Sequence, residues 1–353
     1  MIKRDKILLT GKKTLALTTI LFAGVSAFAM SDMDLVKKVT KAGIKPIPSS
    51  KMEILKLVDD PKNPITDRKV ELGKKLYFEP RLSKSGLISC NTCHNLAAGG
   101  VDGVAAAIGH KWTANPHHLN SPTVYNSVLN KAQFWDGRSP HLEDQAQGPI
   151  QAGPEMAAPA KLVVQRVTSM PGYVNEFKNT YGSSVKIDFK LIADTIAVFE
   201  RTLVTPSSFD DFLNGNLDAL TSEQKEGLNL FIDKGCTSCH NDIGLGGTMQ
   251  AFEVAKKYKF ASLGDFKGDK NGMVKTPTLR NIEETAPYFH NGGIWSLSEA
   301  VKEMGSVQLG LTISDKDAAK ITTFLKTLTG EKPTIIYPIL PVSTNKTPKP
   351  EFN

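Results

Sequence analysis

The sequence predicts a mainly α-helical protein with few or no strands, organised as two similar halves that pack across an interface. Three observations support this prediction. Helical signals recur along the chain, strand signals are few, and motifs of the first half return in the same order in the second. A chain of 353 residues is also long enough for two domains of ordinary size.

The first 29 residues are typical of a secretory signal peptide. Residues 1–13 hold five basic side chains, residues 14–28 are mostly apolar, and Ala27-Phe28-Ala29 fits an A-x-A cleavage site. The apolar core is too short for a transmembrane helix, and no later run is long enough either. We therefore expect an exported, periplasmic protein without a membrane span.

The charge balance changes once these residues are removed. The full chain carries a formal charge of +7, but residues 30–353 hold 38 basic and 35 acidic side chains, which leaves +3. Such a weak excess does not predict a nucleic-acid partner.

Helical signals follow in chain order. The segments that carry them are Thr66 to Phe78, Pro159 to Met170, Asp188 to Leu203, Thr221 to Asp233, Ser296 to Met304 and Ser314 to Leu328. Residues 221–224 (TSEQ) form a capping box, and acidic residues open the last helix, where the helix dipole favours them. Five prolines after Gly330 predict an extended tail over residues 331–353.

An internal repeat divides the chain. Residues 121–126 (SPTVYN) resemble residues 276–281 (TPTLRN), and residues 132–137 (AQFWDG) resemble residues 286–292 (APYFHNG). Turn chemistry shared by Pro and Asn explains single similarities, but the same order in both halves favours a true repeat. We expect a first domain over residues 30–205, whose first helix is free to pack on the other domain, and a second over residues 206–330.

Each half contains one C-x-x-C-H motif. The two thiols of such a motif add to the vinyl groups of a haem, and the adjacent His ligates the iron. The two motifs use all four cysteines, so they predict two covalently bound c-type haems. The attachment residues are Cys90, Cys93, His94, Cys236, Cys239 and His240. Two redox-active cysteine pairs or one four-cysteine zinc site are the alternatives, but neither explains a His directly after both pairs.

The two halves differ in their candidates for the second iron ligand. Met304 follows the repeat of the second half by the length of one helix, and a thioether ligand suits a haem that only transfers electrons. Met249 and Met273 are the alternatives, the first lying nine residues past His240 and the second in a polar turn. The equivalent place in the first half, near Pro149, has no Met, so that haem is either open or closed by another ligand.

The first half supplies candidates for chemistry at an open haem. His110 lies on a Gly- and Ala-rich loop, where we expect a ligand that binds the iron in one state and leaves it in another. Glu155 is the candidate acid–base group for peroxide cleavage, and Gln145 is a candidate for orienting the peroxide. From spacing alone, an exposed loop acid without a catalytic role is an equally good interpretation of Glu155. The remaining assignments are His117, His118 and His141 to the surface and His290 to a hydrogen-bonded pocket position.

With these residues, the chain resembles the bacterial di-haem cytochrome c peroxidases over nearly all of residues 30–330. The segments that carry the resemblance are residues 72–78, 90–100, 108–112, 133–138, 147–149, 155–156, 286–290 and 304–305. It implies two cytochrome-c-like haem domains. In the first, a low-potential peroxidatic haem has His94 as proximal ligand and His110 as displaceable distal ligand. In the second, a high-potential haem on His240 and Met304 transfers electrons.

The same resemblance implies further roles. Glu155 and Gln145 match the distal catalytic pair, and Trp135 matches the aromatic side chain on the electron path between the haems. The residues that match a calcium site, ligated largely by backbone carbonyls, are Asn120, Thr285 and Pro287. Residues 116–119 are slightly expanded relative to the family's pattern, which puts the calcium geometry in doubt. Family members are typically homodimers that take electrons from a small c-type cytochrome or copper protein.

The sequence therefore predicts a cytochrome c peroxidase that reduces hydrogen peroxide to two waters. The alternative is a non-catalytic di-haem electron-transfer cytochrome in which both irons stay six-coordinate. An oxidase relative that matures a protein-derived quinone has Tyr in the place of Met304, which argues against that assignment.

Overall fold

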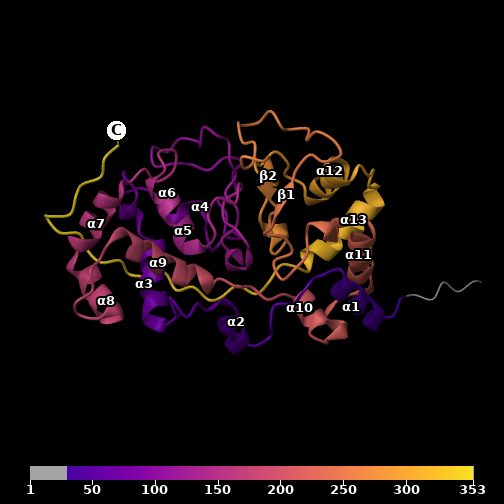
Figure 1. Cartoon of the computed structure of the whole chain (residues 1–353), viewed down its shortest axis with the longest axis horizontal. Coiled ribbons are helices and arrows are strands. Elements are labelled where there is room, and N and C mark those ends of the chain that lie inside the picture. Colours follow the sequence, from indigo (N-terminus) through magenta and orange to yellow (C-terminus); the bar gives the residue numbers. More distant parts are fainter. Residues whose placement is uncertain (1–29, 353) are drawn as a thin grey trace, which may run out of the picture. The chain divides into compact units, whose positions relative to one another are not determined.

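A computed structural model describes residues 30–352, and the mainly helical fold that the sequence predicts is confirmed (Figure 1). The predicted helices are α3 (Asp67–Tyr77), α7 (Ala160–Thr168), α9 (Phe189–Arg201), α11 (Ser222–Asp233), α12 (Leu297–Leu309) and α13 (Asp315–Lys326). The others are α1 (Asp32–Lys41), α2 (Lys51–Val58), α4 (Cys90–Cys93), α5 (Leu142–Gln145), α6 (Gln147–Gln151), α8 (Pro171–Tyr181) and α10 (Ser208–Leu213). The predicted signal peptide, residues 1–29, lies outside the described residues.

The predicted helices begin where the sequence signals place them. The side chains of Thr66, Asp188, Thr221, Ser296 and Ser314 each precede a helix and accept a hydrogen bond from the backbone N–H three residues later. Thr221 also completes the predicted capping box. The helices α1 and α8 bury only two side chains each, so their apolar stripes are too short to stand out in the sequence.

Two helix pairs form the two main hydrophobic cores. Helix α3 packs on α9 in the first core, and α11 packs on α13 in the second. Both pairs meet at a glycine. A Cβ on Gly73 would lie 2.2 Å from the carbonyl oxygen of Thr195, and one on Gly227 would lie 2.0 Å from that of Lys320. Only glycine lets the backbones approach so closely, so both halves use the same packing solution.

The internal repeat folds alike in both halves. Asn126 and Asn281 both have a left-handed backbone, with φ of 60° and 59°, and each begins a short 3₁₀ turn, η2 (Ser127–Leu129) and η5 (Ile282–Glu284). Their backbone N–H groups donate to the carbonyl oxygens of Leu203 and Leu328, both at 2.9 Å. The repeat predicted from the sequence is confirmed.

Strands are few, as predicted. Within residues 30–352 the structure contains β1 (Met249–Ala251) and β2 (Met273–Lys275), which pair antiparallel with Met249 opposite Lys275. Across the same residues, none of the helices combines the length and the apolar character needed to cross a membrane.

Both ends of the described chain pack on distant segments. Helix α1 contacts α11, where Asp32 pairs with Lys225 at 2.8 Å. The tail after Gly330 forms neither helix nor strand and passes α8 and α7 (yellow in Figure 1). There, the buried guanidinium of Arg166 in α7 donates to five carbonyl oxygens, those of Arg81, Ser83, Lys84, Pro348 and Lys349.

Candidate active site

The first C-x-x-C-H motif lies in the wall of a large cavity in the first half. Cys90, Cys93 and His94 line it, with the cysteines on the single turn of α4. The space between its walls, open mouth included, is ≈ 1410 Å³. The Nδ1 of His94 lies 2.9 Å from the carbonyl oxygen of Pro122, which can only accept a hydrogen bond. Nδ1 therefore carries the proton, and Nε2 keeps a lone pair for a metal.

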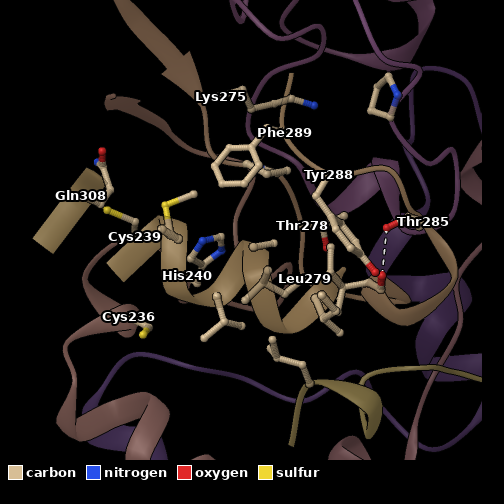
Figure 2. Close-up of a pocket in the computed structure, with 18 of the residues that line it drawn as sticks. Cys236, Cys239, His240, Lys275, Thr278, Leu279, Thr285, Tyr288, Phe289 and Gln308 are labelled. Atoms are coloured by element: carbon tan, nitrogen blue, oxygen red, sulfur yellow. Dashed lines mark hydrogen bonds between the residues drawn. The ribbon is translucent and has the colours of Figure 1, made fainter. Parts of the chain in front are cut away.

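The second motif has the same arrangement in a second cavity. Cys236, Cys239 and His240 line it (Figure 2). The Nδ1 of His240 lies 3.0 Å from the carbonyl oxygen of Leu245, so its Nε2 is free in the same way. Burial lowers the pKa of His240 to about 4, which keeps the imidazole neutral as a metal ligand requires. The space between the walls, open mouth included, is ≈ 1310 Å³.

These features fit two c-type haems. All four cysteines are free thiols, and each pair shares a large cavity with a correctly oriented His. Because the two pairs line different cavities, they do not form the one four-cysteine zinc site that the sequence left as an alternative.

Of the three methionines considered as a ligand, Met304 lies in the right place. It is on α12 and lines the second cavity together with His240. Met249 instead packs on Gly137, where its sulfur would lie 2.3 Å from an added Cβ. Neither Met249 nor Met273 is among the described residues that line this cavity.

The first cavity alone contains an acid–base candidate of the predicted kind. Glu155 and Gln145 both line it, and the carboxylate of Glu155 is half-buried. Burial raises the pKa of Glu155, while Arg138, which lines the same cavity, lowers it. The Arg138 guanidinium stacks 3.5 Å from the centre of the Phe134 ring and pairs with Asp136 at 2.8 Å. A carboxyl whose pKa is raised by burial and opposed by a nearby cation is of the kind that can hold and release a proton.

His110 is buried beside the first cavity but is not among the described residues that line it. Its backbone N–H donates to the carbonyl oxygen of Glu155 at 2.7 Å, and its Nδ1 has no hydrogen-bond partner. A Cβ on the preceding Gly109 would lie 2.1 Å from the carbonyl oxygen of Pro154. The His110 loop therefore packs directly on the segment that carries Glu155.

Trp135 lies in the wall shared by the two cavities. Its indole N–H donates to the carbonyl oxygen of Asn120 at 2.9 Å, and its own carbonyl oxygen accepts the backbone N–H of Lys275 at 2.7 Å. Asn120 and Lys275 hold equivalent positions, each directly before the repeated segment of its half. Trp135 is thus fixed by both halves between the two motifs.

The remaining histidines lie outside the haem-attachment positions. His117 and His141 are exposed, and His117 pairs with Asp265 at 3.0 Å. His118 is half-buried rather than fully exposed, because its side chain packs near Gly264. His290 is buried among aromatic rings, including that of Trp135 at 6.3 Å between ring centres, and burial lowers its pKa to about 4.

The three residues matched to a calcium site lie together. Asn120, Thr285 and Pro287 all line the second cavity, and the Thr285 hydroxyl donates to the carbonyl oxygen of Ile282 at 3.2 Å (Figure 2). Within residues 30–352, no three His, Cys, Asp or Glu side chains gather to hold a metal ion. A cation here would depend on backbone carbonyls, as the family's site largely does.

Sequence reasoning missed three charged residues of the cavities. Arg138 belongs to a segment that the sequence analysis singled out, but its proximity to Glu155 is visible only in the fold. Glu200 on α9 lines the first cavity, and burial, aided by Glu143, raises its pKa to about 8. Lys275 lines both cavities. The one sequence feature that could have identified Lys275 is its position directly before the repeated segment, residues 276–281.

Comparison with known proteins agrees with this geometry. The family profile described as di-haem cytochrome c peroxidase matches residues 67–218, and the profile described as cytochrome c matches residues 224–329. The chain is 43% identical over 338 residues to the cytochrome c551 peroxidase of Pseudomonas aeruginosa, covering 92% of this chain and 95% of that one. It is 48% identical over 287 residues to the cytochrome c551 peroxidase of Nitrosomonas europaea, covering 79% and 85%.

One solved structure extends the similarity to three dimensions. The crystal structure of a MauG-like protein associated with microbial copper homeostasis aligns with a TM-score of 0.67 at 25% identity, over 77% of this chain and 93% of that one. The shared architecture therefore covers most of both chains.

Proposed function

The chain belongs to the di-haem cytochrome c peroxidase family, and we propose that it reduces hydrogen peroxide to two waters, consuming two electrons and two protons. The asymmetry between the cavities carries the proposal. The Glu155 carboxyl lines the first cavity beside the Gln145 amide, whereas no Asp or Glu is among the described residues that line the second cavity, which Met304 shares with His240. One site is thus equipped for proton transfer and the other for electron transfer.

Two c-type haems follow from membership of the family, and we assign them to the two cavities. Cys90 and Cys93 attach the first haem and His94 ligates its iron; Cys236 and Cys239 attach the second, with His240 as ligand. When bound, the first haem supplies the iron at which peroxide is reduced, and the second stores and passes electrons. Met304 would supply the second ligand to that iron, and a thioether ligand would give that haem a high potential.

The chain's own residues then manage the protons of peroxide. The Glu155 carboxylate accepts a proton from one peroxide oxygen and returns it to the other, so that the second oxygen leaves as water. Arg138 opposes the effect of burial on the pKa of Glu155 and so favours the ionised carboxylate that this step requires. The Gln145 amide holds the peroxide in line with Glu155. Trp135 lies on the path by which electrons cross from the second cavity to the first.

The finer assignments extend this proposal. Asn120, Thr285 and Pro287 bind Ca²⁺ through backbone oxygens at the boundary of domains 30–205 and 206–330. The protein works in the periplasm as a homodimer, with residues 1–29 as a cleaved signal peptide. Its electron donor is a small c-type cytochrome or a copper protein.

Steady-state peroxide reduction tests the function. The purified protein with two covalent haems is mixed with a reduced small c-type cytochrome and hydrogen peroxide, and oxidation of the donor is followed. Peroxide-dependent oxidation at two donors per peroxide supports the proposal. Rapid reduction of both haems by the donor without consumption of peroxide would instead support the electron-transfer cytochrome.

A further inference from the structure

Lys275 is a buried cation at the junction of the two cavities. It is 4% exposed, ends strand β2, and lines both cavities as well as the smaller one beside His290. Its backbone N–H is fixed on the carbonyl oxygen of Trp135 at 2.7 Å. In the view of Figure 2 its side chain extends away from Cys239 and His240, along the far side of the cavity. The backbone of Lys275, from which the side chain starts, is therefore fixed by a short strand and by Trp135.

Among the described residues, no carboxylate forms an ion pair with this ammonium group. Among the described residues lining the second cavity there is no Asp or Glu, and Lys275 is the one Lys or Arg. Burial lowers the pKa of its ammonium to about 8, with no carboxylate nearby to oppose the effect. The first cavity differs, because Asp136, Glu155 and Glu200 all line it.

An isolated buried charge is costly, by several kcal/mol even after relaxation, so proteins pair such groups. The group that this cavity is assigned to hold brings its own anions, since each haem carries two propionate carboxylates. We propose that the Lys275 ammonium binds a propionate of the haem attached at Cys236 and Cys239. The inference rests on the cofactor assignment proposed above and does not depend on peroxide turnover.

Such a pair would set the electrostatics of the second haem. A propionate that is paired with Lys275 stays ionised without placing a net negative charge beside the iron. Without the ammonium, the propionate's charge would stabilise the ferric form and lower the reduction potential. The unpaired propionate would also take up a proton when the haem is reduced, so the potential would become dependent on pH.

Spectroelectrochemical titration of the haem-loaded protein at several pH values tests this. Lys275→Met removes the charge and keeps an unbranched side chain, whereas Lys275→Arg keeps the charge as the matched control. We expect Lys275→Met to lower the midpoint potential of the second haem and to steepen its pH dependence. Lys275→Arg should retain the wild-type potential. Haem content and the low-spin spectrum of the second haem should stay unchanged in both variants.

Several outcomes would overturn the proposal. These are unchanged potentials in Lys275→Met, equal shifts in the Met and Arg variants, or a shift confined to the first haem. If neither variant retains haem, a crystal structure of the haem-loaded wild-type protein tests the pairing instead. The Lys275 Nζ must then lie within ~3.2 Å of a propionate oxygen of the second haem. A longer distance contradicts the pairing. A purified protein with one haem or none would instead contradict the underlying cofactor assignment.

Discussion

The side-chain amides of Asn126 and Asn281 donate hydrogen bonds to the same oxygen atom, the hydroxyl of Thr205, at 2.7 and 2.9 Å. The two asparagines are equivalent residues of the internal repeat. All three side chains are buried, and a hydroxyl oxygen offers two lone pairs, one for each amide. The two halves are therefore joined at one side chain, at the residue where the sequence analysis ends the first domain.

Replacing Thr205 with Val should destabilise the whole protein. The change keeps the shape of the side chain but leaves two buried amide donors without an acceptor, at about 1–3 kcal/mol each. Urea unfolding should show a loss of roughly 2–6 kcal/mol. Thr202→Val is the control, because the hydroxyl of Thr202 only donates to the carbonyl oxygen of Phe199 within α9. Equal losses in the two variants would contradict a special role for Thr205.

Glu155→Gln should abolish most turnover while leaving both haems in place. The amide fills the same volume in the first cavity but cannot move a proton between the peroxide oxygens, so we expect a loss of at least ~10²-fold in kcat. Steady-state kinetics and the absorption spectrum report the two effects. Asp144→Asn, an exposed acid in the same half, should leave turnover unchanged. Full activity of Glu155→Gln would remove Glu155 from the mechanism.

Met304→His should lower the reduction potential of the second haem by more than about 100 mV, because an imidazole donates more strongly to ferric iron than a thioether does. A potentiometric titration measures the shift. Met249→His is the control and should change little, since Met249 packs on Gly137 outside the second cavity. The reverse pattern would assign the ligand role to Met249, and no shift in either variant would favour Met273.

A hydrogen bond from the backbone N–H of His110 to the carbonyl oxygen of Glu155 joins the His110 loop to the segment that carries the acid–base candidate. We therefore expect His110 to control the access of peroxide to the first haem. The imidazole is buried beside the cavity with Nδ1 unpartnered, and His110 is not among the described residues that line the cavity. If the His110 imidazole ligates the iron in the oxidised protein, the bond between the imidazole and the iron must break before peroxide binds. We expect oxidised His110→Gly to react with peroxide at once, and wild type to need one electron first.

Stopped-flow mixing of each oxidised protein with peroxide measures this difference. His118→Gly, a half-buried position that is not among the described residues lining the first cavity, should behave like wild type and serves as the control. Immediate reaction by oxidised wild type would show that His110 does not gate the first haem.

Glu200 should make stability fall as pH rises. Burial raises its pKa from 4.5 to about 8 in the folded chain, so the unfolded chain loses this proton first. The contribution of Glu200 is fully present below its unfolded pKa and is lost as pH rises toward about 8. From about pH 5 to pH 8, wild type should lose more than about 1 kcal/mol relative to Glu200→Gln in urea unfolding. The exposed Glu331→Gln should follow wild type; parallel curves for wild type and Glu200→Gln would contradict this.

Helix caps, the C-x-x-C-H motifs and the repeat could be predicted from the sequence, because each depends on residues that are close together in the chain. Side chains such as Thr66 and Ser314 cap the helices that the sequence places after them, because a cap and its first turn are neighbours in the chain. The C-x-x-C-H motifs are equally local, so both cavities could be anticipated. The repeat was also detectable, since Asn126 and Asn281 must each adopt a left-handed turn.

Contacts between distant segments could not be predicted in this way. Lys275 becomes a buried cation between the two cavities only because its strand packs against Trp135 from the other half. Arg138 and Glu155 line the same cavity, and Arg138 affects the pKa of Glu155 only because the fold brings them there. The pKa of Glu200 is raised by the burial of α9, which the sequence around Glu200 does not indicate. His110 could be identified as a ligand candidate, but its place beside the cavity depends on packing against Pro154.

The environment of Arg166 has a consequence for how the protein is made. Of the five carbonyl oxygens around this buried guanidinium, those of Pro348 and Lys349 lie 182 and 183 residues further along the chain. Because synthesis proceeds from the N-terminus, α7 cannot complete its contacts until Pro348 and Lys349 have been added to the chain. A product that ends before Pro348 leaves donors of a buried cation without acceptors, which costs about 1–3 kcal/mol for each. The first half of the enzyme is therefore fully stable only in a full-length chain.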